Sequence, residues 1–256
     1  MVKAIFFDVD GTLVSYENAK VPQSAKEAIQ QLREKGILCV LATGRAIMEL
    51  DDLDVKDMEF DGYITLNGIV GFDKNKEMLW GVTIPEDDFK RGLKMFENHE
   101  MPMTFIEKDR FYNNFIDDTV IYAQETISSP LMEIGEYTGN DVYQMDIFAE
   151  LEMAEYLEKL FPNCTVIKWK KIGFDLVSKI GGKVFGIQKY CDLMGIALED
   201  TMAFGDGGND HEMVEYAHIG IAMGNANEEV KAVADYVTDS VDEDGILHAL
   251  EYFGVL

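Results

Sequence analysis

Short apolar runs alternate with helix-like segments over the first and last parts of the chain. The segment 22–35 carries apolar residues at the spacing of a helix, at Ala25, Ala28, Ile29 and Leu32, and Gly36 ends it. The apolar runs that predict buried strands lie at 3–7, 37–42, 63–66, 201–204, 219–223 and 236–237. Strands that alternate with helices predict an α/β fold with a Rossmann-like parallel sheet covered on both faces.

The middle of the chain has a different pattern. Helical stretches are predicted at 86–98 and 149–160, and short strands at 110–114, 141–148, 165–170 and 174–176. This mixture predicts an inserted α+β domain, with plausible hinges near 84–85 and 180–182. The predicted division is therefore a core in two parts, 1–82 and 183–256, with the inserted domain at 83–182.

Composition limits the class of protein. The 256 residues are 47% hydrophobic and 11% aromatic, which is typical of a globular protein. No apolar run approaches the roughly 20 residues that span a bilayer, and no secretory signal is predicted. Cys39, Cys164 and Cys191 are an odd number without metal-binding spacing, so we expect reduced core residues in a cytoplasmic protein.

The chain is strongly acidic. Its 48 acidic and 22 basic residues give a formal net charge of -26, which disfavours nucleic acid and anionic membranes as partners. The densest acidic segment, 51–61, is predicted to be solvated. An anionic substrate would need local positive charge from a metal or a few lysines. The oligomeric state is left open.

Two aspartates follow the first predicted strand. Asp8 and Asp10 are two residues apart, so both carboxylates can point into one crevice as the strand ends. Close like charges are tolerated if a divalent cation neutralises them or one carries a proton, and Mg²⁺ prefers such oxygen ligands. Gly11 lets the backbone approach a ligand. The alternative is a turn with a helix cap.

A second acidic cluster follows the strand at 201–204. The sequence GDGGND contributes Asp206, Asn209 and Asp210, and its glycines let the chain turn. An ordinary loop that caps the next helix is the alternative. Because the carboxyl ends of parallel strands meet at one edge of a sheet, we expect this cluster to join Asp8 and Asp10 in a metal site.

Other polar residues also follow predicted strands. Thr43, Gly44 and Arg45 come after the second strand, where a hydroxyl and backbone amides could hold phosphoryl oxygens. Thr43 could instead be a helix cap, and Arg45 could be structural. Lys183, at the start of a helical stretch, could offset phosphoryl charge or lie on the surface. Together these residues suit an aspartate nucleophile that forms an aspartyl-phosphate.

Taken together, these motifs resemble those of the haloacid dehalogenase (HAD) superfamily. DVDGT, TGR, the spaced Lys183 and GDGGND match its four motifs in order. The run 205–246 resembles the Cof-type branch, whose members are mostly Mg²⁺-dependent sugar-phosphate and related phosphatases. That branch carries an α+β (C2-type) cap between its second and third motifs, where the insertion is predicted.

The resemblance implies a role for each matching residue. Asp8 would be the nucleophile and Asp10 the acid and base, while Thr43 and Lys183 would hold the phosphoryl group. Mg²⁺ would be bound by Asp8, the backbone carbonyl of Asp10 and Asp206, with Asp210 supporting the metal site. The residues expected near the substrate are Gly11, Thr12, Gly44, Arg45, Asn67, Gly68 and Asn209.

The expected function is a Mg²⁺-dependent phosphatase for a small phosphorylated metabolite, either a sugar phosphate or a cofactor phosphate. A phosphotransferase or phosphomutase, and a non-catalytic phosphoacceptor or metabolite-binding module, are the alternatives. Two positions depart from the family pattern. Lys183 is followed by Val184 instead of glycine, with Lys179 nearby, and His211, predicted to be a surface residue, replaces an apolar residue.

Overall fold

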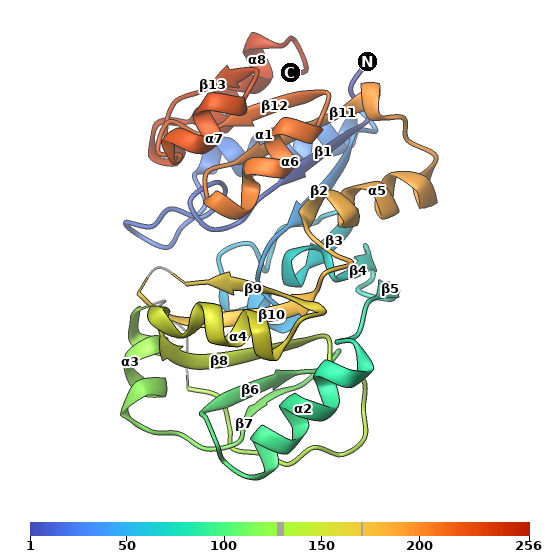
Figure 1. Cartoon of the computed structure of the whole chain (residues 1–256). Helices are drawn as coiled ribbons and strands as arrows, with labels where there is room; N and C mark the ends of the chain where they lie inside the picture. Colours follow the sequence, from blue (N-terminus) through green and yellow to red (C-terminus); the bar gives the residue numbers. More distant parts are fainter. Residues whose placement is uncertain (127–130, 170) are drawn as a thin grey trace. The chain divides into compact units, whose positions relative to one another are not determined.

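The computed structural model describes residues 1–126, 131–169 and 171–256, and the chain forms two compact units (Figure 1). The first unit contains Met1–Trp80 and Gly181–Leu256, and the second contains Gly81–Ile180. These limits lie close to the boundaries predicted for the inserted domain.

The first unit is built on a sheet with the strand order β13-β12-β11-β1-β2-β3-β4-β5. Neighbouring strands from β13 to β3 are parallel. This confirms the predicted parallel core, and each of its strands overlaps a predicted one. Their bounds are Ala4–Phe7 (β1), Leu38–Ala42 (β2), Gly62–Thr65 (β3), Thr201–Gly205 (β11), Ile219–Ala222 (β12) and Tyr236–Val237 (β13).

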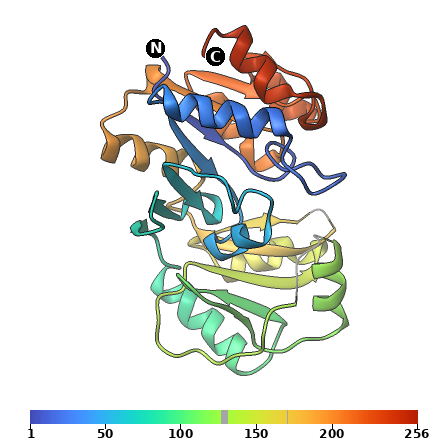
Figure 2. The same ribbon diagram turned by 180° about the vertical axis from the view of Figure 1, so that it is seen from behind.

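Helices cover both faces of this sheet (Figures 1 and 2). On one face, residues of α5 and α6 pack against Phe6 and its neighbours, through Ile187 and Met213 among others. On the other face lie α1, whose predicted apolar residues are all buried, and α8. The helices of this unit are Gln23–Glu34 (α1), Lys183–Met194 (α5), His211–Tyr216 (α6), Glu228–Val233 (α7) and Gly245–Tyr252 (α8).

One edge of the sheet departs from the prediction. Strand β4 (Val70–Asp73) runs antiparallel to β3, and β5 (Met78–Gly81) lies beyond it. The chain reverses at Leu66, Asn67 and Gly68, whose φ angles are 50°, 53° and 93°. Such left-handed conformations allow a tight turn, so a hairpin forms here instead of a helical crossover.

The acidic segment 51–61 is only partly solvated. Val55 and Phe60 are buried. Asp54 accepts a hydrogen bond from the amide of Val21 (3.0 Å), and Asp61 accepts one from the amide of Cys39 (3.0 Å). The prediction of a solvated segment is therefore wrong for these two aspartates, because their carboxylates satisfy backbone donors at the edge of the core.

The second unit has a five-stranded sheet with the order β7-β6-β8-β10-β9, whose neighbouring strands are antiparallel. Its apolar face, with Phe105, Met145 and Phe174, packs with residues of α2 and α4. The strands are Met103–Ile106 (β6), Phe111–Asn113 (β7), Gln144–Glu150 (β8), Cys164–Lys168 (β9) and Ile172–Ser178 (β10), and the helices are Glu86–Glu97 (α2), Asp118–Thr126 (α3) and Ala154–Leu160 (α4).

The elements of the second unit were predicted less accurately than those of the first. The predicted helix at 149–160 is wrong at its start, because Ala149 and Glu150 belong to β8. Strand β6 and helix α3 were not predicted. Residue 170, at the end of the strand predicted at 165–170, lies outside the described residues.

Three buried cysteines and several short 3-10 helices complete the fold. Cys39, Cys164 and Cys191 are free and buried, which confirms their prediction as core residues. Among the described residues, no helix has the length and apolar character needed to cross a membrane. Short 3-10 helices lie at Ile47–Asp52, Leu151–Met153, Leu198–Asp200, Gly208–Asp210 and Val241–Glu243.

Candidate active site

The predicted motifs meet at one edge of the first unit's sheet. Strand β1 lies between β2 and β11, so the chain winds away from β1 in both directions. Such a switch in strand order leaves a crevice beyond the carboxyl ends of the strands. Asp8 follows β1, Thr43 follows β2, Asn67 follows β3 and Asp206 follows β11. Residues distant in the sequence are thereby brought to one crevice.

Lys183 connects two aspartates in the interior of this site. Its ammonium lies 2.6 Å from Oδ1 of Asp8 and 2.5 Å from Oδ1 of Asp210, and only 3% of the residue is exposed. Burial lowers the pKa of the lysine, but the two carboxylates outweigh burial and hold its pKa above the ordinary value. Lys183 is therefore a buried cation in contact with Asp8. Lys179, the alternative, is exposed.

The site has more negative charge than Lys183 balances. Asp8, Asp206 and Asp210 are all buried, and each offers a carboxylate oxygen within 4.8 Å of the others. Burial and the charge of Asp210 raise the pKa of Asp8 well above its ordinary value, Lys183 lowers it, and Asp206 and Asp10 raise it further. A second cation would therefore relieve the repulsion among these carboxylates.

Asp210 also organises the loop after β11. Its Oδ2 accepts hydrogen bonds from the amides of Asp206 (3.0 Å) and Gly207 (2.9 Å), while its Oδ1 accepts from Lys183. Thr12 donates to Oδ1 of Asp206 (3.2 Å). These contacts are those of an ordinary loop that leads into a helix, which was the alternative to a metal site. The same loop also places a carboxylate oxygen of Asp206 within 4.8 Å of one of Asp8.

Asp10 has a different partner from Asp8. Its carboxylate accepts two hydrogen bonds from Arg45, one from Nε and one from Nη2, each 2.8 Å long. Arg45 also lies 3.7 Å from Glu49, and its amide donates to the hydroxyl of Thr43 (3.1 Å). The structure thus brings Arg45 onto the side chain of Asp10, a contact that the sequence did not predict.

Asn67 and Gly68 link β3 to the rest of the site. Asn209 donates to Oδ1 of Asn67 (3.1 Å), and Gly44 lies against the same amide group, since a Cβ added there would be 3.2 Å from that oxygen. At Gly68 a Cβ would collide with the backbone carbonyl of Gly182. This close approach holds the turn after β3 against the segment that leads into α5.

Two residues at the site were missed by sequence reasoning. Asn225, after β12, donates to the carbonyl of Gly11 (2.8 Å) and accepts from the amide of Val241 (2.9 Å). Tyr16 donates to the backbone carbonyl of Asp10 (2.8 Å). An amide side chain after a strand of the same sheet could have pointed to Asn225, whereas nothing in the sequence distinguished Tyr16. His211 lies at the start of α6 and is half-buried.

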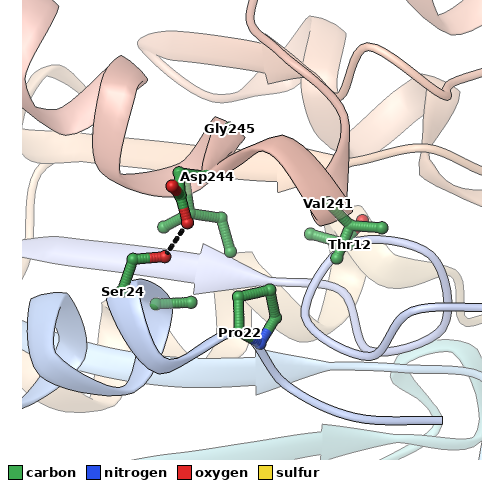
Figure 3. A pocket seen from close by; sticks show the side chains of 8 residues that line it. Thr12, Pro22, Ser24, Val241, Asp244 and Gly245 are labelled. Atoms are coloured by element: carbon green, nitrogen blue, oxygen red, sulfur yellow. Dashed lines mark hydrogen bonds between the residues drawn. The ribbon is translucent and has the colours of Figure 1, made fainter. Parts of the chain in front are cut away.

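A small pocket lies beside Thr12 of the first motif (Figure 3). Thr12 contributes to its wall together with Pro22 and Val241, and Ser24 donates a hydrogen bond to Asp244 there. Of the motif residues only Thr12 lines it. The pocket is therefore separate from the carboxylate cluster.

The chain is similar to phosphatases of known sequence and structure. A family model described as haloacid dehalogenase-like hydrolase matches residues 5–250. The structure of the phosphatase BT1666 from Bacteroides thetaiotaomicron is 31% identical, with a TM-score of 0.90, and the match covers 100% of this chain and 96% of that one. The sugar phosphatase BT4131, of HAD subclass IIB, is 35% identical with a TM-score of 0.85, and both chains are fully covered. The 5-amino-6-(5-phospho-D-ribitylamino)uracil phosphatase YcsE of Bacillus subtilis is 26% identical over 98% of this chain and 96% of its own.

Proposed function

The chain belongs to the Cof-type branch of the haloacid dehalogenase-like hydrolases and is a phosphatase of that family, and we propose that it hydrolyses a small phosphorylated metabolite, with Mg²⁺, through an aspartyl-phosphate. The observation that supports this most directly is the buried contact between Asp8 and Lys183, 2.6 Å long, inside a cluster of further carboxylates.

The donor set suits a hard divalent cation. Asp8 and Asp206 offer carboxylate oxygens. We propose that the backbone carbonyl of Asp10 completes a set of the oxygen types that Mg²⁺ prefers. Ligands about 2.1 Å from an ion are at most about 4.2 Å apart, so oxygens within 4.8 Å of one another need only a small adjustment. The bound cation would offset the charge of the phosphoryl group. Asp210, whose oxygens already accept hydrogen bonds from Lys183 and two amides, would support this set by holding the loop.

Asp8 would attack the phosphorus atom while the bond from phosphorus to the leaving oxygen breaks. For this the carboxylate must be ionised, and Lys183 favours that form while burial opposes it. Thr43 accepts a hydrogen bond from the amide of Arg45, so its own hydroxyl proton can be directed at a phosphoryl oxygen. Lys183 would supply a positive charge to the same group.

Asp10 would donate a proton to the leaving oxygen and then accept one from the water that attacks the phosphoaspartate. The water's attack breaks the bond between phosphorus and Asp8 and releases inorganic phosphate. In the structure both carboxylate oxygens of Asp10 accept hydrogen bonds from Arg45. Asp10 must therefore release at least one of these hydrogen bonds before it can act as the acid.

The proposed substrate class is a sugar phosphate or a cofactor phosphate. Among the related proteins, BT4131 is a sugar phosphatase, and YcsE acts on a phosphorylated ribitylaminouracil. A test panel should accordingly contain hexose and pentose phosphates, phosphorylated cofactor precursors and one aryl phosphate.

The test is phosphate release from this panel with Mg²⁺, with EDTA, and with Asp8→Asn. We expect release only with Mg²⁺, and a loss of more than about a thousandfold in Asp8→Asn. Asp51→Asn is the matched control, because 65% of the Asp51 side chain is exposed, and it should retain full activity. Aryl phosphate hydrolysis that survives in Asp8→Asn would show that the proposed nucleophile is wrong.

A further inference from the structure

The hydroxyl of Tyr16 lies on a backbone oxygen that the proposed cation needs. It donates a 2.8 Å hydrogen bond to the carbonyl of Asp10. The edge of its ring covers the turn at Gly11, where an added Cβ would collide with Cε2 of Tyr16 and with the carboxylate of Asp206. Tyr16 thus borders both the carbonyl and a carboxylate of the proposed metal site, although 61% of the residue is exposed.

The contact with the carbonyl of Asp10 fixes the role of this hydroxyl. A carbonyl oxygen can only accept a hydrogen bond, so the phenol is the donor in this contact. A donor directed at a carbonyl oxygen presents its partial positive charge to the space in front of that oxygen.

We propose that Tyr16 is a positioning residue that competes with the divalent cation for the carbonyl of Asp10. Without the cation, the phenol satisfies this carbonyl. With the cation bound, the hydroxyl hydrogen and the cation would face each other across one oxygen, so the hydroxyl moves away. A carbonyl oxygen has two lone pairs, but both partners here are positive and repel each other. This inference rests on the proposed function, in which the Asp10 carbonyl is a metal ligand.

The competition can be measured without substrate. Binding of Mn²⁺ to the whole chain is followed by electron paramagnetic resonance, which reports the free ion. Tyr16→Phe keeps the ring and removes the hydroxyl, so we expect its Kd for Mn²⁺ to be about fivefold lower, the effect of one lost hydrogen bond. Tyr252→Phe, at a residue that is 66% exposed, is the control and should bind as the unaltered chain does. An unchanged or higher Kd in Tyr16→Phe would overturn the proposal.

A second readout follows the tyrosine itself. In proton–carbon spectra of the tyrosine rings, the signal that is absent from Tyr16→Phe should shift when Mg²⁺ is added. A Tyr16 signal that stays in place while the chain binds Mg²⁺ would contradict the proposal. If the unaltered chain binds no Mn²⁺ and releases no phosphate, the cation of the proposed function is wrong and this inference falls with it. If it binds Mn²⁺ and releases phosphate while Tyr16→Phe binds equally, only this inference is wrong.

Discussion

Replacing Lys183 by methionine should destabilise the first unit strongly at neutral pH when no divalent cation is present. Methionine has a similar length and no charge, so the change removes the ammonium and leaves the packing nearly intact. Lys183 is the buried cation that contacts Asp8 (2.6 Å) and Asp210 (2.5 Å). Without it, buried carboxylates face one another uncompensated.

The size of the loss follows from the cost of neutralising a buried carboxylate by protonation. One aspartate can take up a proton, and this costs about 1.4 kcal/mol for each pH unit above its ordinary pKa of about 3.9. The loss in the free energy of unfolding should therefore approach about 4 kcal/mol at pH 7 and about 1.5 kcal/mol at pH 5. The upper value agrees with the roughly 3–5 kcal/mol measured when one partner of a buried ion pair is removed.

The sign of the pH dependence is fixed by proton binding. The pKa of Asp8 is raised in the folded state, and loss of Lys183 removes the charge that lowers it, so the folded variant binds more protons than the unfolded chain does. Stability then falls as pH rises from the ordinary aspartate pKa of about 3.9 towards the raised folded value of Asp8. Mg²⁺ should recover part of the loss, because it binds the folded site.

Urea unfolding with a fluorescence probe in the first unit measures this loss. The chain has two tryptophans, so a Trp169→Phe background leaves Trp80, whose indole donates to the carbonyl of Gly68 in the first unit. Lys179→Met, at an exposed lysine, is the control and should lose little. A loss below about 1 kcal/mol at pH 7, or an equal loss at pH 5 and pH 7, would refute the electrostatic argument.

Three further changes test separate parts of the site. Asp10→Asn should lower kcat for alkyl phosphates about 10²- to 10⁴-fold and for an aryl phosphate much less, since an aryl leaving group needs less protonation; equal losses on both would argue against an acid role. Asn225→Ala removes the hydrogen bond to the carbonyl of Gly11. Thermal unfolding should then show a loss of about 1–2 kcal/mol in the free energy of unfolding, and calorimetry should show a weaker affinity for Mg²⁺. Unchanged metal binding would mean that Asn225 is purely structural. Gly68→Ala should lower the free energy of unfolding by more than Gly36→Ala does. Both glycines have a left-handed φ, but only at Gly68 would the added Cβ collide with a backbone carbonyl, that of Gly182. Equal losses, each about 1–2 kcal/mol, would mean that this close approach is unimportant.

The core of the first unit was predictable because its strands are buried on both faces. Such strands have continuous apolar runs, and α1 between them has a clear helical repeat, so both patterns mark the elements directly. The hairpin that adds β4 depends on left-handed φ angles at Leu66 and Asn67. Asn67-Gly68 is a dipeptide typical of tight turns, but leucine rarely adopts that conformation, so the sequence did not mark a reversal that begins at Leu66.

The second unit was harder to predict because some of its elements bury polar residues, such as Thr104 and Gln124, beside apolar ones. Strand β6 carries Thr104 between two apolar residues, a pattern too short to separate from a loop. Helix α3 has little helical periodicity, since its buried residues include Gln124. A pattern of apolar residues identifies an element that buries one wholly apolar face. Strand β6 and helix α3 bury polar residues as well, so this signal is weak in them.

Motif spacing predicted which strands would bring the motif residues to the edge of the sheet, but it could not distinguish the two aspartates of the first motif. That distinction arises from partners distant in the sequence. Asp8 faces Lys183, whose position depends on the crossing of α5 over the sheet, and Asp10 faces Arg45, at the end of β2. One carboxylate is buried among negative charges, and the other is partly exposed and held by a guanidinium. In the proposed mechanism these two groups would act as nucleophile and as acid, roles that need different environments, and a separation of two residues along the chain is enough to provide such environments.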